Sequence, residues 1–132
     1  LYISNYYTSE AYYYNKNLDS AYFVNCIIDG SLSDEISLDA SGSTYSGSFN
    51  YIFENSMLKT TASTDNDGMH YFNVFKNQSP AFKNSSENDY QLQSGSAAID
   101  KGINTGINYD LNNQSRPNAS TSIPDLGAYE FY

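Results

Sequence analysis

Three groups of side chains in this chain have the types and spacing that could support chemistry. The first is a set of carboxylates in one short stretch, Asp34, Glu35 and Asp39. Paired carboxylates cleave glycosides, one acting as the acid and the other as the base or nucleophile. Acidic turns of this composition are common, however, and no Arg or Lys stands beside these residues to act as the base of a lyase. We therefore expect no catalytic residue here.

The second group is the tetrapeptide Asp65-Asn66-Asp67-Gly68. Oxygen ligands at alternate positions before a glycine are typical of a calcium loop. The glutamate that completes such a loop is missing at the required spacing. The sequence favours a solvated acidic turn, with calcium as the only cofactor to consider and with Asp65 and Asp67 as its candidate ligands.

The third group is aromatic. Tyr12, Tyr13 and Tyr14 are consecutive, and they follow the pair Tyr6-Tyr7. Tyrosine combines an apolar ring face with a polar tip, so exposed tyrosines can stack on sugar rings. Because tyrosines also cover the faces of ordinary sheets, the sequence favours a structural role for these rings over sugar binding. Tyr12, Tyr13 and Tyr14 remain the candidate glycan-binding residues.

Composition limits the fold and the partners. The 132 residues fit one domain, and 14 Tyr, 7 Phe and many Asn and Ser residues favour strands joined by polar turns. A net charge of −9 would repel nucleic acid. The single cysteine, Cys26, excludes an internal disulfide, and we expect it to be buried.

No apolar run approaches the roughly 20 residues of a membrane helix. Because the chain opens on Leu1, we expect a mature or trimmed fragment.

One phrase occurs twice, thirty residues apart. Phe23–Ile28 reads FVNCII and Phe53–Leu58 reads FENSML, with shorter echoes at Phe75 and Phe82. We expect each Asn to bend the chain between two short strands, with Asn25 stacked over Asn55 so that their amides bond to each other. Such units are typical of the coils of a β-solenoid. The alternative is a β-sandwich in which the match is accidental.

Five phrases in the second half of the chain point to a family. They are SPAF at 79–82, DYQL at 89–92, SAAIDKG at 96–102, RP at 116–117 and PDLGAYE at 124–130. Together they resemble the C-terminal segment of bacterial right-handed parallel β-helix proteins of the pectate-lyase-like class, in particular the choice-of-anchor Q domain. The resemblance implies an all-β fold. Residues 1–76 would form β-helix coils, and residues 77–132 would form the C-terminal coil and cap of the same domain.

The resemblance also implies structural roles for the charges and aromatic rings of the tail. We expect Arg116 to hold two aspartates and so to join distant loops. We also expect the aromatic ending to form a strand along the last coil and to close its open edge. The expected structural residues are Asn25, Asn55, Asp100, Asp110, Arg116, Asp125, Tyr129 and Phe131.

These observations favour a non-catalytic role. The expected protein is the C-terminal part of an exported β-helix protein on a bacterial cell surface, attached to the outer membrane or secreted. Its expected partners are a polysaccharide or a neighbouring surface protein, with no nucleic acid and no transmembrane segment. The alternative is the tail of a polysaccharide lyase or glycoside hydrolase whose catalytic coils lie outside this sequence.

Overall fold

A computed structural model describes residues 1–42, 47–65, 68–119 and 122–132. In these ranges the chain is all β, apart from one short 3-10 turn, η1 (Ser85–Glu87), and no described helix is long and apolar enough to cross a membrane. The strands in chain order are β1 (Tyr2–Ser4), β2 (Tyr6–Ser9), β3 (Tyr12–Asn15), β4 (Leu18–Val24), β5 (Ile27–Ile28), β6 (Ser37–Asp39), β7 (Phe49–Glu54), β8 (Met57–Leu58), β9 (Tyr71–Phe72), β10 (Phe75–Lys76), β11 (Phe82–Asn84) and β12 (Asp89–Leu92).

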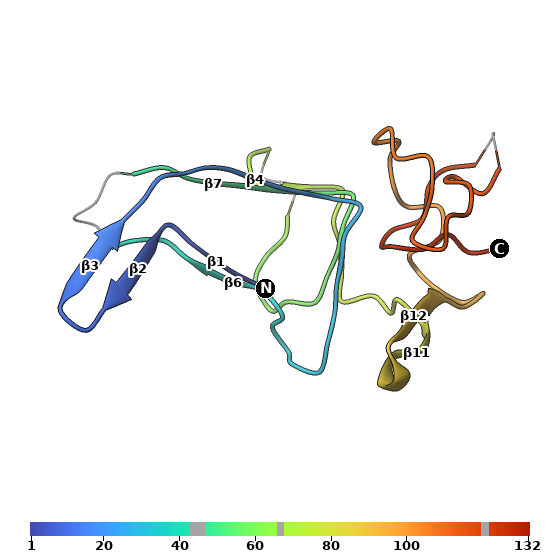
Figure 1. Ribbon diagram of the computed structural model, residues 1–132, viewed down its shortest axis with the longest axis horizontal. Coiled ribbons are helices and arrows are strands. Elements are labelled where there is room, and N and C mark those ends of the chain that lie inside the picture. Colours follow the sequence, from blue (N-terminus) through green and yellow to red (C-terminus); the bar gives the residue numbers. More distant parts are fainter. Residues whose placement is uncertain (43–46, 66–67, 120–121) are drawn as a thin grey trace.

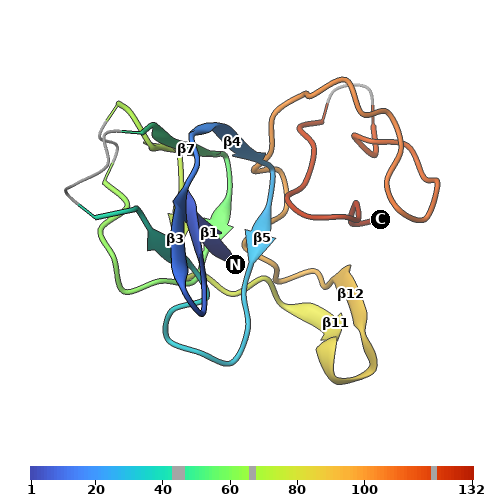
Figure 2. The same ribbon diagram turned by 60° about the vertical axis from the view of Figure 1, so that its left-hand side comes forward.

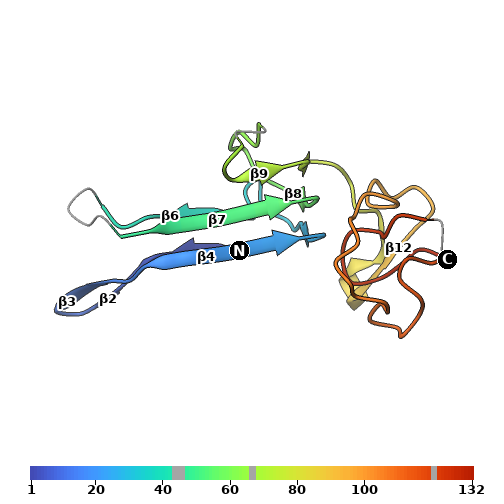
Figure 3. The same ribbon diagram turned by 90° about the horizontal axis from the view of Figure 1, so that it is seen from above.

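Most of the strand pairing is parallel. Strands β4, β7 and β9 form one three-stranded parallel sheet, β5, β8 and β10 form a second, and β1 pairs with β6 in parallel (Figure 3). Two antiparallel hairpins complete the described strands. These are β2–β3 at one end of the molecule and β11–β12 near the tail (Figure 1). All five sheets are small, and none of them closes on itself within the described residues.

An internal column of aromatic rings follows from the parallel register. Phe23 lies beside Phe53, and Phe53 lies beside Tyr71. The rings of Phe23 and Phe53 stack with centroids 4.8 Å apart, and those of Phe53 and Tyr71 with centroids 5.9 Å apart. Stacked aromatic neighbours on adjacent strands stabilise a sheet beyond the area that they bury.

The expected bends at Asn25 and Asn55 are confirmed. Asn25 (φ 55°) separates β4 from β5, and Asn55 (φ 42°) separates β7 from β8. Asparagine tolerates this left-handed conformation better than most residues, which explains its place in the repeated phrase. Because the strands on both sides pair in parallel, the two bends lie side by side, and the match between the two phrases is not accidental.

The third unit differs from the one that the sequence suggested. It is Tyr71–Lys76, with its bend at Asn73 (φ 52°). The echo at Phe75 lies one strand later, since Phe75 follows this bend in β10 and its Asn77 (φ 53°) forms a further left-handed bend. The echo at Phe82 is wrong, because Phe82 begins the antiparallel hairpin β11–β12. Tyr71 replaces the leading Phe of the phrase, which concealed the match.

The sheet β5–β8–β10 is apolar on both faces. Met57 and Leu58 are consecutive and both buried, because successive strand residues point to opposite faces. One face joins the inner cluster, whose buried members are Ile3, Phe53 and Leu58. The other face joins a second cluster with residues from the hairpin and the tail, whose buried members are Met57, Leu92, Ala98 and Leu126.

The tail therefore covers a sheet face. The expected terminal strand is absent, since residues 122–132 form no strand and the only bridge described after β12 joins Tyr109 to Ser115. Leu126 is fully buried in the second cluster, and Phe131 packs against it half-buried. The tail forms few of the backbone hydrogen bonds that pair strands in a sheet. Burial of apolar side chains and hydrogen bonds from side chains hold it in place instead.

Candidate functional site

The hairpin β2–β3 carries most of the exposed aromatic surface at its end of the molecule (Figure 1). Its register places Tyr7 opposite Tyr14, and the two rings stack with centroids 4.6 Å apart and planes 12° from parallel. Tyr12 lies on the same face, with its ring centroid 6.0 Å from that of Tyr14. The exposed fractions of Tyr7, Tyr12 and Tyr14 are 53%, 67% and 38%. We call these three residues the tyrosine platform.

The expected triplet of tyrosines is divided between two faces. Tyr13 points away from the platform, because strand side chains alternate, and its ring stacks on Tyr6 with centroids 4.8 Å apart. Tyr7 takes its place on the platform face, while Tyr13 is 49% exposed on the other face. Strand periodicity could have shown this exchange once Tyr6–Ser9 and Tyr12–Asn15 were recognised as a hairpin.

Asp39 supports the hairpin from the neighbouring sheet. Its Oδ2 atom accepts hydrogen bonds from the hydroxyls of Tyr2, at 2.8 Å, and of Tyr6, at 2.6 Å. These bonds, that from Tyr6 first, hold the pKa of Asp39 below its ordinary value, and the same carboxylate raises the pKa of Tyr6. Asp39 thus joins β6 to the base of the tyrosine hairpin.

The other carboxylates of the acidic stretch bind different partners. Asp34 accepts hydrogen bonds from the Thr61 hydroxyl, at 2.5 Å, from the Thr61 amide, at 2.6 Å, and from the Thr60 hydroxyl, at 2.8 Å, and these bonds lower its pKa. Glu35 accepts the Leu32 amide at 2.7 Å. Each carboxylate is engaged by neutral donors of its own loop or of a neighbouring one, which is the arrangement of structural turns.

The calcium hypothesis rests on residues that the structure describes only in part. Asp67 lies outside the described residues. Asp65 accepts a hydrogen bond from the Ser63 hydroxyl at 2.7 Å. Within the described ranges no group of three or more His, Cys, Asp or Glu side chains is placed to hold a metal ion.

Cys26 and His70 have separate surroundings. Burial raises the pKa of the Cys26 thiol, whose sulfur lies 3.4 Å from the carbonyl oxygen of Val24. The His70 ring stacks on Tyr51 with centroids 4.2 Å apart, and its Nδ1 lies 2.9 Å from the Tyr51 carbonyl oxygen. Neither residue is placed to activate the other.

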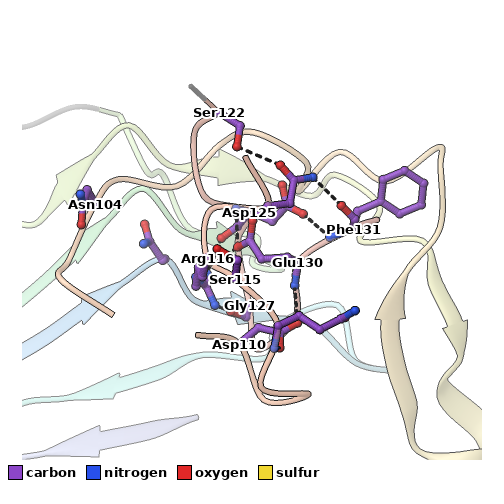
Figure 4. Close-up of polar contacts among 12 residues, drawn as sticks. Asn104, Asp110, Ser115, Arg116, Ser122, Asp125, Gly127, Glu130 and Phe131 are labelled. Carbon is purple, nitrogen blue, oxygen red and sulfur yellow. Dashed lines mark hydrogen bonds and ion pairs between the residues drawn. The ribbon is translucent and has the colours of Figure 1, made fainter. Parts of the chain in front are cut away.

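Arg116 is the centre of the polar network in the tail (Figure 4). Its Nε atom lies 3.2 Å from Oε1 of Glu130, and both side chains are almost fully buried. Its other nitrogens donate to the backbone carbonyls of Gly127 and Asp125. The expectation that Arg116 holds two aspartates is wrong, since its only ion-pair partner in the described chain is Glu130. This acid lies in the PDLGAYE phrase but had not been singled out.

The aspartates of the tail bind backbone amides instead. Asp110 accepts the amides of Asn112, at 2.8 Å, Gln114, at 2.9 Å, and Glu130, at 3.1 Å. A carboxylate that binds three amides closes its own turn and joins it to the chain end. The structural role expected for Asp110 therefore has a defined set of contacts.

Asp125 connects two further segments. Its oxygens accept the amide of Asp100, at 2.7 Å, and that of Phe131, at 2.6 Å. Asp100 contributes its backbone, and its φ of 54° is left-handed. Burial raises the pKa values of both Asp125 and Glu130, and hydrogen bonds from backbone amides oppose the shift. Two buried acids and one arginine therefore share the centre of the tail.

The asparagines of the bends fasten this tail to the parallel sheets. Asn25 exchanges two hydrogen bonds with the backbone of Ile103, and the Nδ2 atom of Asn55 donates to the Lys101 carbonyl at 2.9 Å. The amides therefore do not bond to each other as expected, because the tail offers them backbone partners. Gly127 adds a bond from its amide to the Asn25 carbonyl, at 2.7 Å. Its φ is +86°, and a Cβ atom there would lie 2.9 Å from Ile27.

The tyrosine platform and the tail network thus differ in accessibility. The first presents rings to solvent, whereas the second is buried, and its carboxylates bind Arg116 or backbone amides, apart from the Oε2 atom of Glu130, which has no hydrogen-bond partner in the described chain. Comparison with protein-family models, curated proteins and solved structures found no match. The function of the chain must therefore be inferred from its geometry.

Proposed function

We propose that this chain is a non-catalytic glycan-binding module, and that the tyrosine platform is its binding surface. The observation that carries the proposal is the exposed, ordered set of rings formed by Tyr7, Tyr12 and Tyr14. Tyr7 and Tyr14 use one ring face each for their mutual stacking, so a sugar unit would pack on the outer face of that pair or on the tilted ring of Tyr12, since the apolar face of a pyranose packs on an aromatic ring. The phenol hydroxyls at the ring edges can bond to the sugar hydroxyls.

The surroundings favour a preorganised platform. Tyr7 and Tyr14 already stack on each other, so little side-chain entropy is lost when a ligand arrives. Tyr6, on the opposite face, is held by Asp39 and by Tyr13. The net charge of −9 favours neutral glycans over acidic ones.

The proposal includes the architecture and the location of the protein. The parallel strand–bend–strand units and the five tail phrases support a right-handed parallel β-helix of the choice-of-anchor Q type. In that arrangement residues 77–132 are its last coil and cap, and the protein is displayed on a bacterial cell surface. Strand β4 is an edge strand of its sheet, so further coils would pair with it in parallel. A full-length structure with an antiparallel strand on β4 would contradict this architecture.

Binding to a panel of polysaccharides tests the function. Affinity electrophoresis with xyloglucan, galactomannan, mixed-linkage glucan and polygalacturonate should detect binding to at least one neutral glycan. Tyr12→Ala and Tyr14→Ala should each weaken that binding, by up to about tenfold, because each loses an aromatic contact worth about 0.5–1.5 kcal/mol. Tyr109→Ala is the matched control, since Tyr109 is 61% exposed, close to the 67% of Tyr12, but lies in the tail.

The same samples distinguish the competing functions. Release of oligosaccharide from any glycan would favour a hydrolase, and release of an unsaturated product would favour a lyase. Binding that survives both platform substitutions would exclude the platform as the site. Absence of binding to every glycan would contradict the proposal and would favour a neighbouring surface protein as the partner.

A further inference from the structure

A cavity lies at the other end of the molecule from the tyrosine platform. It forms where β5, the hairpin β11–β12 and the tail meet (Figure 2) and has a volume of about 360 Å³. Its floor contains Ile27 and Leu126, and aromatic rings from Phe82, Tyr90 and Tyr129 line it. A cavity of this size and lining fits a small ligand with an apolar body.

Two of the rings form a fixed wall. Phe82 and Tyr90 pack edge to face, with centroids 5.3 Å apart and planes 84° from parallel. They come from paired strands of the hairpin β11–β12. The floor belongs to the second hydrophobic cluster, in which Leu126 is fully buried. The cavity is therefore bounded by packed elements.

One carboxylate stands at the rim of this apolar cavity. Asp29 follows β5 directly, and only 27% of its side chain is exposed. No described residue donates a hydrogen bond to its carboxylate, and the ammonium of Lys59 approaches it only to 4.0 Å while donating to the Gly30 carbonyl. A partly exposed carboxylate that accepts no hydrogen bond from a described side chain or backbone amide is free to accept a charge-assisted hydrogen bond from a cationic ligand.

The cavity continues past Asp29 into a more polar hollow. Asp29, Phe82 and Tyr90 line both spaces, and the second, also about 360 Å³, adds Ser31 and Ser85. The carboxylate thus lies where an apolar chamber meets a polar one. This order matches a ligand with a hydrophobic body and a charged amine at its end.

We propose that this cavity binds a small organic ammonium ion, with its aromatic or aliphatic body against Phe82, Tyr90 and Tyr129 and its charged nitrogen at Asp29. The proposal is independent of glycan binding by the tyrosine platform, because it uses different residues at the other end of the molecule. The ring faces attract the cation, and the net charge of −9 attracts it further at long range.

Three probes of nearly equal size test the charge preference at pH 7. Benzylamine is cationic, benzyl alcohol is neutral and benzoate is anionic, and saturation-transfer NMR titrations would measure the dissociation constant of each. Benzylamine should bind with a dissociation constant in the millimolar range, about tenfold tighter than benzyl alcohol, and benzoate should bind most weakly. Equal affinities for the three probes, or no saturable binding, would overturn the proposal.

Two substitutions separate the contributions of charge and of ring contact. Asp29→Asn should remove the preference for benzylamine while benzyl alcohol binds as before. Tyr90→Ala should weaken both probes severalfold, and because Tyr90 is 44% exposed the fold should survive its loss. Tyr12→Ala, on the distant platform, is the control and should change neither affinity. A benzylamine preference that persists in Asp29→Asn would contradict the site.

Discussion

Asn25 and Ile103 form a reciprocal pair of hydrogen bonds across 78 positions of sequence, from Nδ2 to the Ile103 carbonyl at 2.7 Å and from the Ile103 amide to Oδ1 at 2.9 Å. One amide side chain thus satisfies a donor and an acceptor of a tail segment that has no ladder of its own. The same residue supplies the left-handed bend between β4 and β5. The bend between the two strands and the attachment of the tail therefore both depend on asparagine at this position.

Glycine substitutions separate these two roles. Asn25→Gly and Asn55→Gly retain the left-handed backbone but lose the side-chain bonds to the tail, so each should destabilise the protein by about 1–3 kcal/mol. Asn73→Gly is the matched control, because Asn73 occupies the same bend in the third unit with an exposed side chain. It should stay within about 0.5 kcal/mol of the parent. Urea denaturation measures the differences, and equal effects at the three bends would refute the anchoring role.

The buried ion pair should behave as a unit. Arg116→Met leaves Glu130 buried without its cation and should cost about 3–5 kcal/mol. The double variant Arg116→Met with Glu130→Gln removes the uncompensated charge and keeps an acceptor for the Asp125 amide, so it should recover part of that loss. A double-mutant cycle from urea titrations checks this, and strict additivity would show that the two side chains are not coupled.

Stability should have a maximum near the ordinary carboxyl pKa, at about pH 4. Glu130 and Asp125 have raised pKa values in the folded protein. Their contribution to the free energy of unfolding is therefore complete below the ordinary carboxyl pKa and is lost as the pH rises through their raised pKa values. Asp34 and Asp39 have lowered pKa values, so their contribution is present above that range and is lost as the pH falls. The two pairs therefore act on opposite sides of the maximum.

Urea midpoints measured between about pH 2.5 and 7 test this profile. Glu130→Gln should flatten the decline on the alkaline side, and Asp39→Asn should flatten the decline on the acidic side. Each variant serves as the control for the other. Stability that rises steadily from pH 4 to 7 would contradict the burial effect on Glu130 and Asp125.

Removal of the chain end should unfold the protein. Deleting Gly127–Tyr132 removes the bond to Asn25, the partner of Arg116 and the packing of Phe131, and the loss should exceed about 5 kcal/mol. A domain of ordinary marginal stability cannot absorb this. Tyr132→Ala is the control, since Tyr132 is exposed and should cost less than about 1.5 kcal/mol. Size-exclusion chromatography and calorimetry would detect the outcome, and a monomeric deletion variant with an unchanged melting temperature would refute the prediction.

The bends could be predicted because they depend on local chemistry. A repeated Phe-x-Asn phrase with apolar residues on both sides indicates short strands joined by a left-handed turn, and Asn25 and Asn55 occupy such turns. The all-β class follows from the same patterns and from the tyrosine and serine content. The third unit was missed because its aromatic residue is Tyr71, and its bend at Asn73 follows Phe72.

The partners of the tail depended on distant parts of the chain. The sequence indicates that Arg116 needs a carboxylate, but four acidic residues lie between Asp89 and the chain end, and only folding selects Glu130. The choice follows from geometry, because Asp110 and Asp125 are closer to backbone amides that have no other acceptor. Packing of the tail on the outer face of β5–β8–β10 likewise creates the cavity beside Asp29, which joins residues more than 90 positions apart and has no signal in local sequence.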